Sequence, residues 1–169
     1  DRVRQSYPQS GSVFKPFIYA SAFSRGYNPS SLINDAPIIF EDENLETFWR
    51  PENYSGKFYG LTTLREALVQ SINIVSIKLL REIGIKKSSE TVDNFGFEVE
   101  RLPQDLSLAL GSGNFSPAEV ARGFSVFANN GMISDIHYVD KIKDKNGDII
   151  FDHSEIDAVN ILSLIHISE

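Results

Sequence analysis

Residues 11–23 read GSVFKPFIYASAF, and this stretch decides the fold. Its apolar side chains recur at helical spacing, which predicts a helix with a buried face: Phe14, Phe17, Ile18 and Ala22. Pro16 falls in the first turn, where a missing backbone N–H costs least, and Gly26 is a suitable stop. Ser12 is therefore expected at or just inside the N-terminus of this helix.

Ser12 and Lys15 are candidate catalytic residues. Three positions apart on a helix, their side chains share one face and can meet. A serine becomes a useful nucleophile when a neighbour takes its proton, and a desolvated lysine can do so. The helix N-terminus favours a developing alkoxide, and the Ser12 N–H could act as an oxyanion donor. The bare pair is a weak motif, so the alternative is a helix cap beside an exposed lysine.

Length and composition fit one domain with a core, since the 169 residues are 41% hydrophobic and 23% charged. The net charge of −7 argues against a nucleic-acid partner. Without Cys, disulfides, thiolate zinc sites and Cys nucleophiles are excluded. No stretch has the length of a membrane helix and no signal peptide opens the chain, so we expect any anchor upstream of Asp1.

The rest of the chain predicts a mainly helical body followed by one β-ribbon. Residues 27–61 look irregular, or conceal short elements. A second helix starts at Thr63 and ends near Gly84, with a break near residues 71–73. A short helix is expected near residues 88–94.

Ser116 caps a further helix that runs to about Asn129, with Glu119 completing a capping box. Residues 139–144 and 148–151 flank Asn146-Gly147, the strongest short-range hairpin signal.

Ser71 and Asn73 form an S-x-N element at the predicted helix break, where both side chains can point into a cleft. A hydroxyl there could relay a proton, and an amide could bind a substrate amide. A rival copy, residues 112–114, lies in a Gly-rich turn and is interpreted as a loop.

The remaining candidates favour structural interpretations. The histidines, at positions 137, 153 and 166, show no spacing to an acid or ligand partner. Lys145-Asn146-Gly147 resembles a K-[ST]-G element but falls at a hairpin tip. Carboxylates in residues 41–46 indicate a solvated loop, so no metal site is predicted. Five aromatics could line a groove or serve as packing: Phe48, Trp49, Tyr54, Phe58 and Tyr59.

Together these stretches resemble the class A, bifunctional penicillin-binding proteins, which polymerise and cross-link peptidoglycan. The similar stretches occur in the family's order, with similar gaps: Gly11–Phe17, Trp49–Tyr54, Leu64–Leu68, Ser71–Asn73, Leu108–Gly111 and Phe127–Gly131. The combination is specific where each motif alone is not.

The resemblance implies an α+β fold of the serine D,D-peptidase and β-lactamase-like type, present mainly as its helical part plus one β-hairpin. By resemblance, Ser12 attacks the D-Ala-D-Ala carbonyl of a peptidoglycan stem peptide, and Lys15 accepts the serine proton. Ser71 passes that proton to the leaving amine, and Asn73 holds the peptide backbone. β-Lactams would inhibit by acylating Ser12. This chemistry needs no metal and no cofactor.

The chain departs from the family pattern, since the third element, K-[ST]-G, is absent. Residues 1–161 are therefore expected to be an incomplete transpeptidase domain, inactive by itself. The parent protein is expected to carry a membrane anchor and a glycosyltransferase domain, and to face the periplasm from the inner membrane.

Residues 162–169, LSLIHISE, resemble the translation of a transposon adapter used in sequencing libraries. We expect this tail to be non-native, the alternative being a native amphipathic segment; the underlying codons would decide.

Two other functions stay open. A β-lactamase-like hydrolase would share Ser12 and Lys15 but needs a deacylating glutamate, and it would turn β-lactams over. A non-catalytic β-lactam or peptidoglycan-binding module would bind without acyl transfer.

Overall fold

The computed structural model describes residues 1–42, 47–153 and 159–162. Six α-helices lie in this part of the chain: α1 (Arg2–Gln5), α2 (Lys15–Phe23), α3 (Leu64–Val69), α4 (Asn73–Ile83), α5 (Ile85–Asn94) and α6 (Pro117–Ala128). Short 3-10 turns join them: η1 (Gly11–Phe14), η2 (Val99–Arg101) and η3 (Leu106–Leu110).

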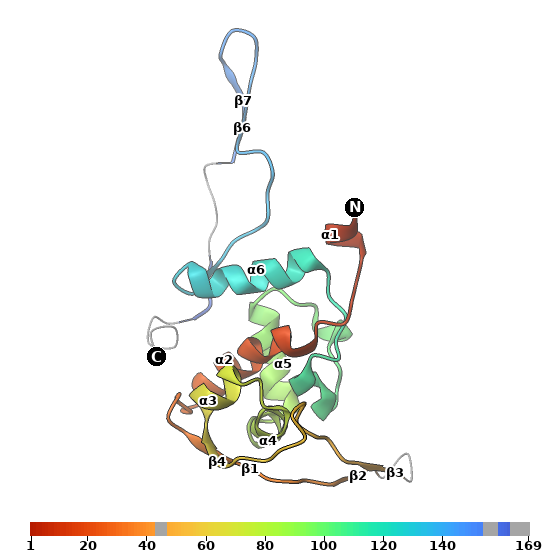
Figure 1. Cartoon of the computed structure of the whole chain (residues 1–169). Helices are drawn as coiled ribbons and strands as arrows, with labels where there is room; N and C mark the ends of the chain where they lie inside the picture. Colours follow the sequence, from red (N-terminus) through yellow and green to blue (C-terminus); the bar gives the residue numbers. More distant parts are fainter. Residues whose placement is uncertain (43–46, 154–158, 163–169) are drawn as a thin grey trace.

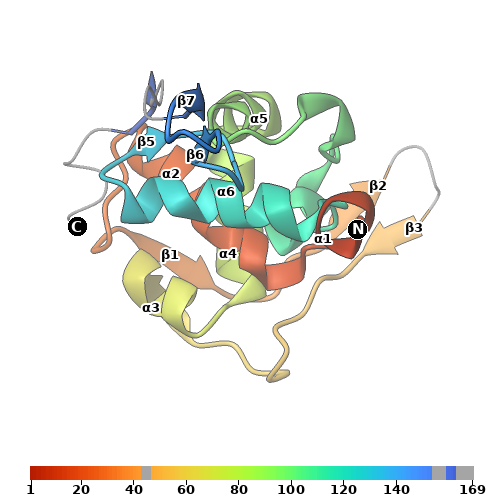
Figure 2. The same cartoon turned by 90° about the horizontal axis from the view of Figure 1, so that it is seen from above.

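The described strands form two-stranded antiparallel sheets. Strands β1 (Leu32–Asp35) and β4 (Gly60–Thr63) make one pair, and β2 (Phe40–Asp42) and β3 (Thr47–Trp49) another. Strands β5 (Met132–Ile133) and β8 (Val159–Asn160) pair, as do β6 (Lys141–Lys143) and β7 (Ile149–Asp152). Figure 1 shows the helices gathered into one body, from which the β6–β7 hairpin stands away, and Figure 2 shows the same body from above. This arrangement confirms the predicted α+β fold, with a mainly helical part and the predicted hairpin at β6–β7, to which the structure adds the other strand pairs.

Helix α2 is central and contacts α3, α4 and α5. It is buried on nearly all sides, not on one face as the sequence pattern predicted, since even Lys15 and Ser21 are at most 1% exposed. A helix enclosed in this way must satisfy its polar side chains within the protein.

Phenylalanine rings from distant segments pack around the first turns of α2. Phe14 stacks on Phe115, and Phe17 meets Phe95 and Phe97 edge-on, with ring centroids 4.9 to 5.4 Å apart. Helix α6 approaches closely because Gly123 has no side chain, since a Cβ there would lie 2.8 Å from Phe97 and 3.0 Å from Phe17. This cluster fixes the start of α2 against α6.

A backbone clamp holds the segment that leads into η1. Ser10 N–H donates to Gly113 O at 3.0 Å, and Gly11 N–H donates to Gly111 O at 2.8 Å. Phe115 N–H donates to Pro8 O at 3.1 Å, so residues 8–11 and 111–115 run side by side. The position of Ser12 therefore depends on a turn about a hundred residues later in the chain.

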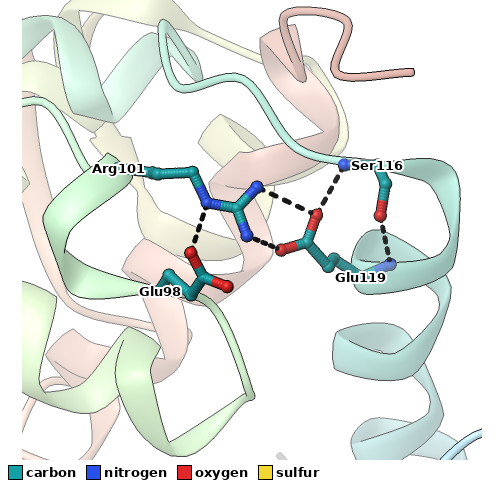
Figure 3. Close-up of polar contacts among 4 residues, drawn as sticks. All are labelled: Glu98, Arg101, Ser116 and Glu119. Carbon is teal, nitrogen blue, oxygen red and sulfur yellow. Dashed lines mark hydrogen bonds and ion pairs between the residues drawn. The ribbon is translucent and has the colours of Figure 1, made fainter. Parts of the chain in front are cut away.

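Arg101 ties the α6 N-terminus to the neighbouring loop, as Figure 3 shows. Its guanidinium pairs with Glu98 at 2.8 Å and with Glu119. Glu119 also accepts from Ser116 N–H at 2.7 Å, while its own N–H donates to the Ser116 hydroxyl. The capping box predicted from Ser116 and Glu119 is confirmed.

Other local predictions are also confirmed. Thr63 caps α3 through Glu66 N–H, α3 and α4 are separated at residues 70–72, and the hairpin turns at Asn146-Gly147. The third predicted helix begins at Ile85, three residues earlier than expected.

Residues 27–61 conceal short elements, which was one of the predicted alternatives: strands β1, β2 and β3 lie within this segment, and β4 begins at its end. Strand β1 pairs with β4, so that Leu32 lies opposite Thr63. The two segments are far apart in the sequence, and no local pattern reveals their pairing. The β5–β8 pair was likewise missed, since each of its strands has two residues.

Of the suspected tail, residues 163–169 lie outside the described residues. Leu162 is 4% exposed and donates its N–H to Gly131 O at 3.2 Å. Within the described part of the chain, none of the helices combines the length and apolar character needed to cross a bilayer.

We expect Gly111→Ala to lower the free energy of unfolding by more than about 2 kcal/mol. Gly111 has φ of +72°, and a Cβ there would lie 1.9 Å from Gly11 O, inside the clamp. The control is Gly56→Ala, where φ is +66° but nothing lies within 4 Å, so only the backbone strain of about 1 kcal/mol applies. Urea unfolding of both variants measures the difference, and equal losses would refute a clamp that depends on close approach.

Candidate active site

The Lys15 amine lies at the centre of the site. Lys15 begins α2, is 1% exposed, and uses all three N–H donors of its ammonium group. Its Nζ donates to Ser71 O at 2.6 Å, to Ser71 Oγ at 2.9 Å and to Asn73 Oδ1 at 2.8 Å. The structure therefore brings together three of the four predicted site residues.

Burial changes the pKa of the Lys15 amine. Desolvation lowers the pKa of Lys15 from 10.5 to about 8. All three acceptors are neutral oxygens, so no carboxylate contacts the amine to oppose this shift. At pH 7 roughly a tenth of the molecules would carry a neutral Lys15, which is the form a general base requires.

Ser71 faces Lys15 because the backbone turns sharply between α3 and α4. Its φ is +55°, a left-handed conformation that is uncommon for a residue with a side chain. The turn is fixed by Ile72 N–H, which donates to Ala67 O at 2.8 Å. This backbone conformation presents both the carbonyl and the hydroxyl of Ser71 to one amine.

Asn73 opens α4, and its amide has a defined orientation. Its Nδ2 donates to Glu52 O at 2.9 Å, so its Oδ1 faces Lys15. An amide nitrogen carries two hydrogens, and Glu52 O takes one of them.

Ser12 is exposed and lies in η1, one turn before Lys15. The Ser12 carbonyl accepts a hydrogen bond from the backbone N–H of Lys15, and this bond closes the turn between the two residues. Within the described part of the chain, the Ser12 hydroxyl makes no hydrogen bond. Catalytic contacts of this kind often tighten only when substrate binds.

Asn53 and Asp35 also support the site, and sequence reasoning missed their roles. Asn53 Oδ1 accepts from Asn73 N–H at 3.0 Å and from Ile74 N–H at 3.1 Å, and so caps α4 from a distant loop. Its Nδ2 donates to both oxygens of Asp35 at 2.9 Å. Asn53 belongs to one of the stretches that carry the family resemblance, whereas Asp35 carries no sequence signal of its own.

A pocket of about 580 Å³ borders the turn that carries Ser71. Its wall includes Gln70 and Ile72, the two neighbours of Ser71, together with Tyr59 and Glu66. Of the aromatic candidates, Tyr59 therefore lines a pocket, whereas Tyr54 is fully exposed and Trp49 stacks on Phe40. The side chain of Phe48 and residues 43–46 lie outside the part of the chain that the structure describes.

The remaining candidates do not reach the site. The rival copy at residues 112–114 forms part of the backbone clamp, and the Ser112 hydroxyl contacts that of Ser107. The prediction that His137 has no acidic partner is wrong, because its Nε2 lies 2.8 Å from Asp140 Oδ1 on the surface. That pair is formed across three residues of an exposed segment. His166 lies outside the described residues, among which no cluster of metal-binding side chains is found.

The sequence matches the family described as penicillin binding protein transpeptidase domain over residues 2–163. The chain belongs to this family. Among curated relatives, it is 42% identical over 151 residues to penicillin-binding protein 1A of Pseudomonas aeruginosa, and 43% identical over 148 residues to that of Neisseria flavescens. These alignments cover 89% and 87% of the chain but 18% of each relative.

Solved structures agree with this assignment. The crystal structure of penicillin-binding protein 1A from Haemophilus influenzae superposes with a TM-score of 0.87 at 35% identity, over 94% of this chain and 23% of that one. The penicillin-binding protein A of Mycobacterium tuberculosis, as an imipenem acyl-enzyme complex, shares the fold with a TM-score of 0.84 at 18% identity. The match covers 99% of this chain and 43% of the Mycobacterium tuberculosis chain. The resemblance to class A penicillin-binding proteins is confirmed.

We expect the Lys15 amine of this transpeptidase-family chain to titrate with a midpoint near pH 8. The lysine Cε–Hε signals in heteronuclear NMR measure this, and a Lys15→Arg variant identifies the signal. A midpoint near the usual 10.5 would show that the amine is not desolvated.

The shift also gives a pH dependence of stability. Between about pH 8 and 10.5 the folded chain holds Lys15 neutral while the unfolded chain still binds the proton, so stability from this group rises with pH. Unfolding of the wild type and of Lys15→Met at several pH values should show the wild type gaining relative to the variant across that window. A difference that is constant, or falls, contradicts the shift.

Proposed function

We propose that this domain acts in a peptidoglycan D,D-transpeptidase, with Ser12 as nucleophile and Lys15 as its base. Neutral Lys15 accepts the Ser12 proton while Ser12 Oγ attacks the D-Ala-D-Ala carbonyl of a stem peptide. The tetrahedral oxyanion collapses, the amide bond breaks, and the departing D-Ala amine receives the proton through Ser71. An amine of a second stem peptide then attacks the ester, and Ser12 regains its proton.

The observation that carries this proposal is the buried amine of Lys15 one turn after an exposed serine. A lysine kept only for structure would be expected to keep its head group in water. Here the amine is enclosed and contacts a hydroxyl, Ser71 Oγ, which can itself donate and accept a proton. The proposed nucleophile and base come from one turn of the chain, Ser12 to Lys15, and the proposed relay from the adjoining loop, which supports these three roles.

Asn73 would bind the substrate backbone. Its Oδ1 is occupied by Lys15 and one hydrogen of Nδ2 by Glu52 O, so the second hydrogen of Nδ2 is the group that would donate to a substrate carbonyl.

The finer assignments belong to the same proposal. The parent protein would be anchored in the inner membrane, face the periplasm and carry a glycosyltransferase domain, as the class A resemblance implies. β-Lactams would acylate Ser12 and leave slowly. Residues 1–161 would be an incomplete transpeptidase domain and residues 162–169 a non-native tail, so this chain by itself would be inactive.

The test is acylation by a labelled penicillin, with the modified residue identified by mass spectrometry. In the complete protein we expect one label per chain, on Ser12, and no label in Ser12→Ala. Ser71→Ala should slow acylation by a factor of about a hundred or more, since the relay is lost. The 169-residue chain should react at least a hundredfold more slowly than the complete protein.

Each outcome bears on one part of the proposal. A label on any other residue of the complete protein would reject Ser12 as nucleophile. Equal rates for the short and complete chains would reject the inactivity of this chain. Repeated turnover of the penicillin, in place of one trapped equivalent, would favour a β-lactamase-like hydrolase.

A further inference from the structure

A buried carboxylate lies behind the site, two hydrogen-bonded residues away from the Lys15 amine. Asp35 ends β1 and is 1% exposed. Its Oδ1 and Oδ2 accept from Asn53 Nδ2, and Oδ2 also accepts from Tyr59 N–H at 2.9 Å. Lys78 lies nearby but donates to the carbonyls of Asn34 and Ala36. The carboxylate is thus used as an acceptor of neutral N–H groups.

These contacts fix the orientation of the Asn53 amide. On its nitrogen side are acceptors only, the Asp35 carboxylate and Lys57 O at 2.9 Å. On its oxygen side are donors only, the N–H groups of Asn73 and Ile74. A flipped amide would set oxygen against oxygen and N–H against N–H, so one orientation is allowed.

Asn53 in turn positions Asn73. Its Oδ1 holds the backbone of Asn73, and the preceding carbonyl, Glu52 O, holds the Asn73 side chain. Both contacts come from adjacent residues of one loop, so a displaced Asn53 would also displace Glu52 O. The Asn73 Oδ1 that accepts from Lys15 depends on this pair of contacts.

We propose that Asp35 is a positioning residue, which acts through Asn53 to orient Asn73 and hold its oxygen against the Lys15 amine. The property that matters is that an ionised carboxylate accepts hydrogen bonds and donates none. An asparagine of the same shape would bring its own NH₂ group against either Asn53 Nδ2 or Tyr59 N–H. The proposal rests on the proposed function for its catalytic meaning, but the orientation itself needs no substrate.

The test is amide hydrogen exchange in the 169-residue chain with Asp35→Asn. We expect the amides of Asn73 and Ile74 to exchange at least tenfold faster relative to those of residues 77–83, which lie in the same helix. The Lys15 Cε–Hε signal should shift in the same variant. Glu119→Gln is the control, because it also replaces a carboxylate by an amide, in an ion pair with Arg101 that shares no residue with Asp35, Asn53 or Asn73, and it should change neither reading.

A reciprocal exchange separates orientation from general damage. Asn53→Asp alone places two carboxylates face to face and should also expose both amides. In the double variant D35N/N53D, the carboxylate introduced at position 53 can accept from Asn73 N–H, from Ile74 N–H and from the amide introduced at position 35. Protection at both backbone amides should therefore return at least in part.

Three results would overturn the proposal. These are unchanged exchange at Asn73 and Ile74 in Asp35→Asn, an equal rise along all of α4, or a Lys15 signal that does not move. Because none of these readings uses acylation, a moved Lys15 signal without acylation of Ser12 in the complete protein would reject the transpeptidase mechanism and leave the positioning role intact.

Discussion

The buried amine of Lys15 is the constraint on which the rest of the site depends. An ammonium group removed from water must have all its donors satisfied, because an unpaired buried charge costs several kcal/mol. None of the three acceptors belongs to α2. They come instead from the turn between α3 and α4, which must therefore be sharp enough to present the oxygens of Ser71 and Asn73 together.

The position of Ser12, the proposed nucleophile, is set by a second, independent set of contacts. Residues 8–11 are held by the backbone of residues 111–115, and the rings around Phe14 and Phe17 hold the first turns of α2. The two S-x-N copies in the sequence thus have different tasks. Ser71 and Asn73 face the Lys15 amine with their side chains, whereas the copy at residues 112–114 supports the entry to Ser12 with the carbonyl of Gly113.

Sequence reasoning succeeded where the information is local. Caps at Thr63 and Ser116, the break near Ser71 and the Asn146-Gly147 turn each depend on residues three or four positions apart. It failed for β1 and β4, whose pairing joins segments far apart in the chain, and for the enclosure of α2 on nearly all sides. It also missed Asp35, because a single aspartate in a strand acquires its meaning only from the amide placed against it.

The chemical nature of these contacts explains how the site can hold a base. If a carboxylate contacted the Lys15 amine directly, the pair would favour the charged ammonium and raise its pKa, and the amine could not accept a proton near neutrality. The structure places only neutral oxygens on the amine, while the nearest carboxylate of this hydrogen-bonded chain, Asp35, acts through two amides. Each amide side chain fixes the orientation of the next residue through hydrogen bonds, but it carries no net charge of its own. The Lys15 amine is thereby held by three hydrogen bonds while its pKa stays lowered.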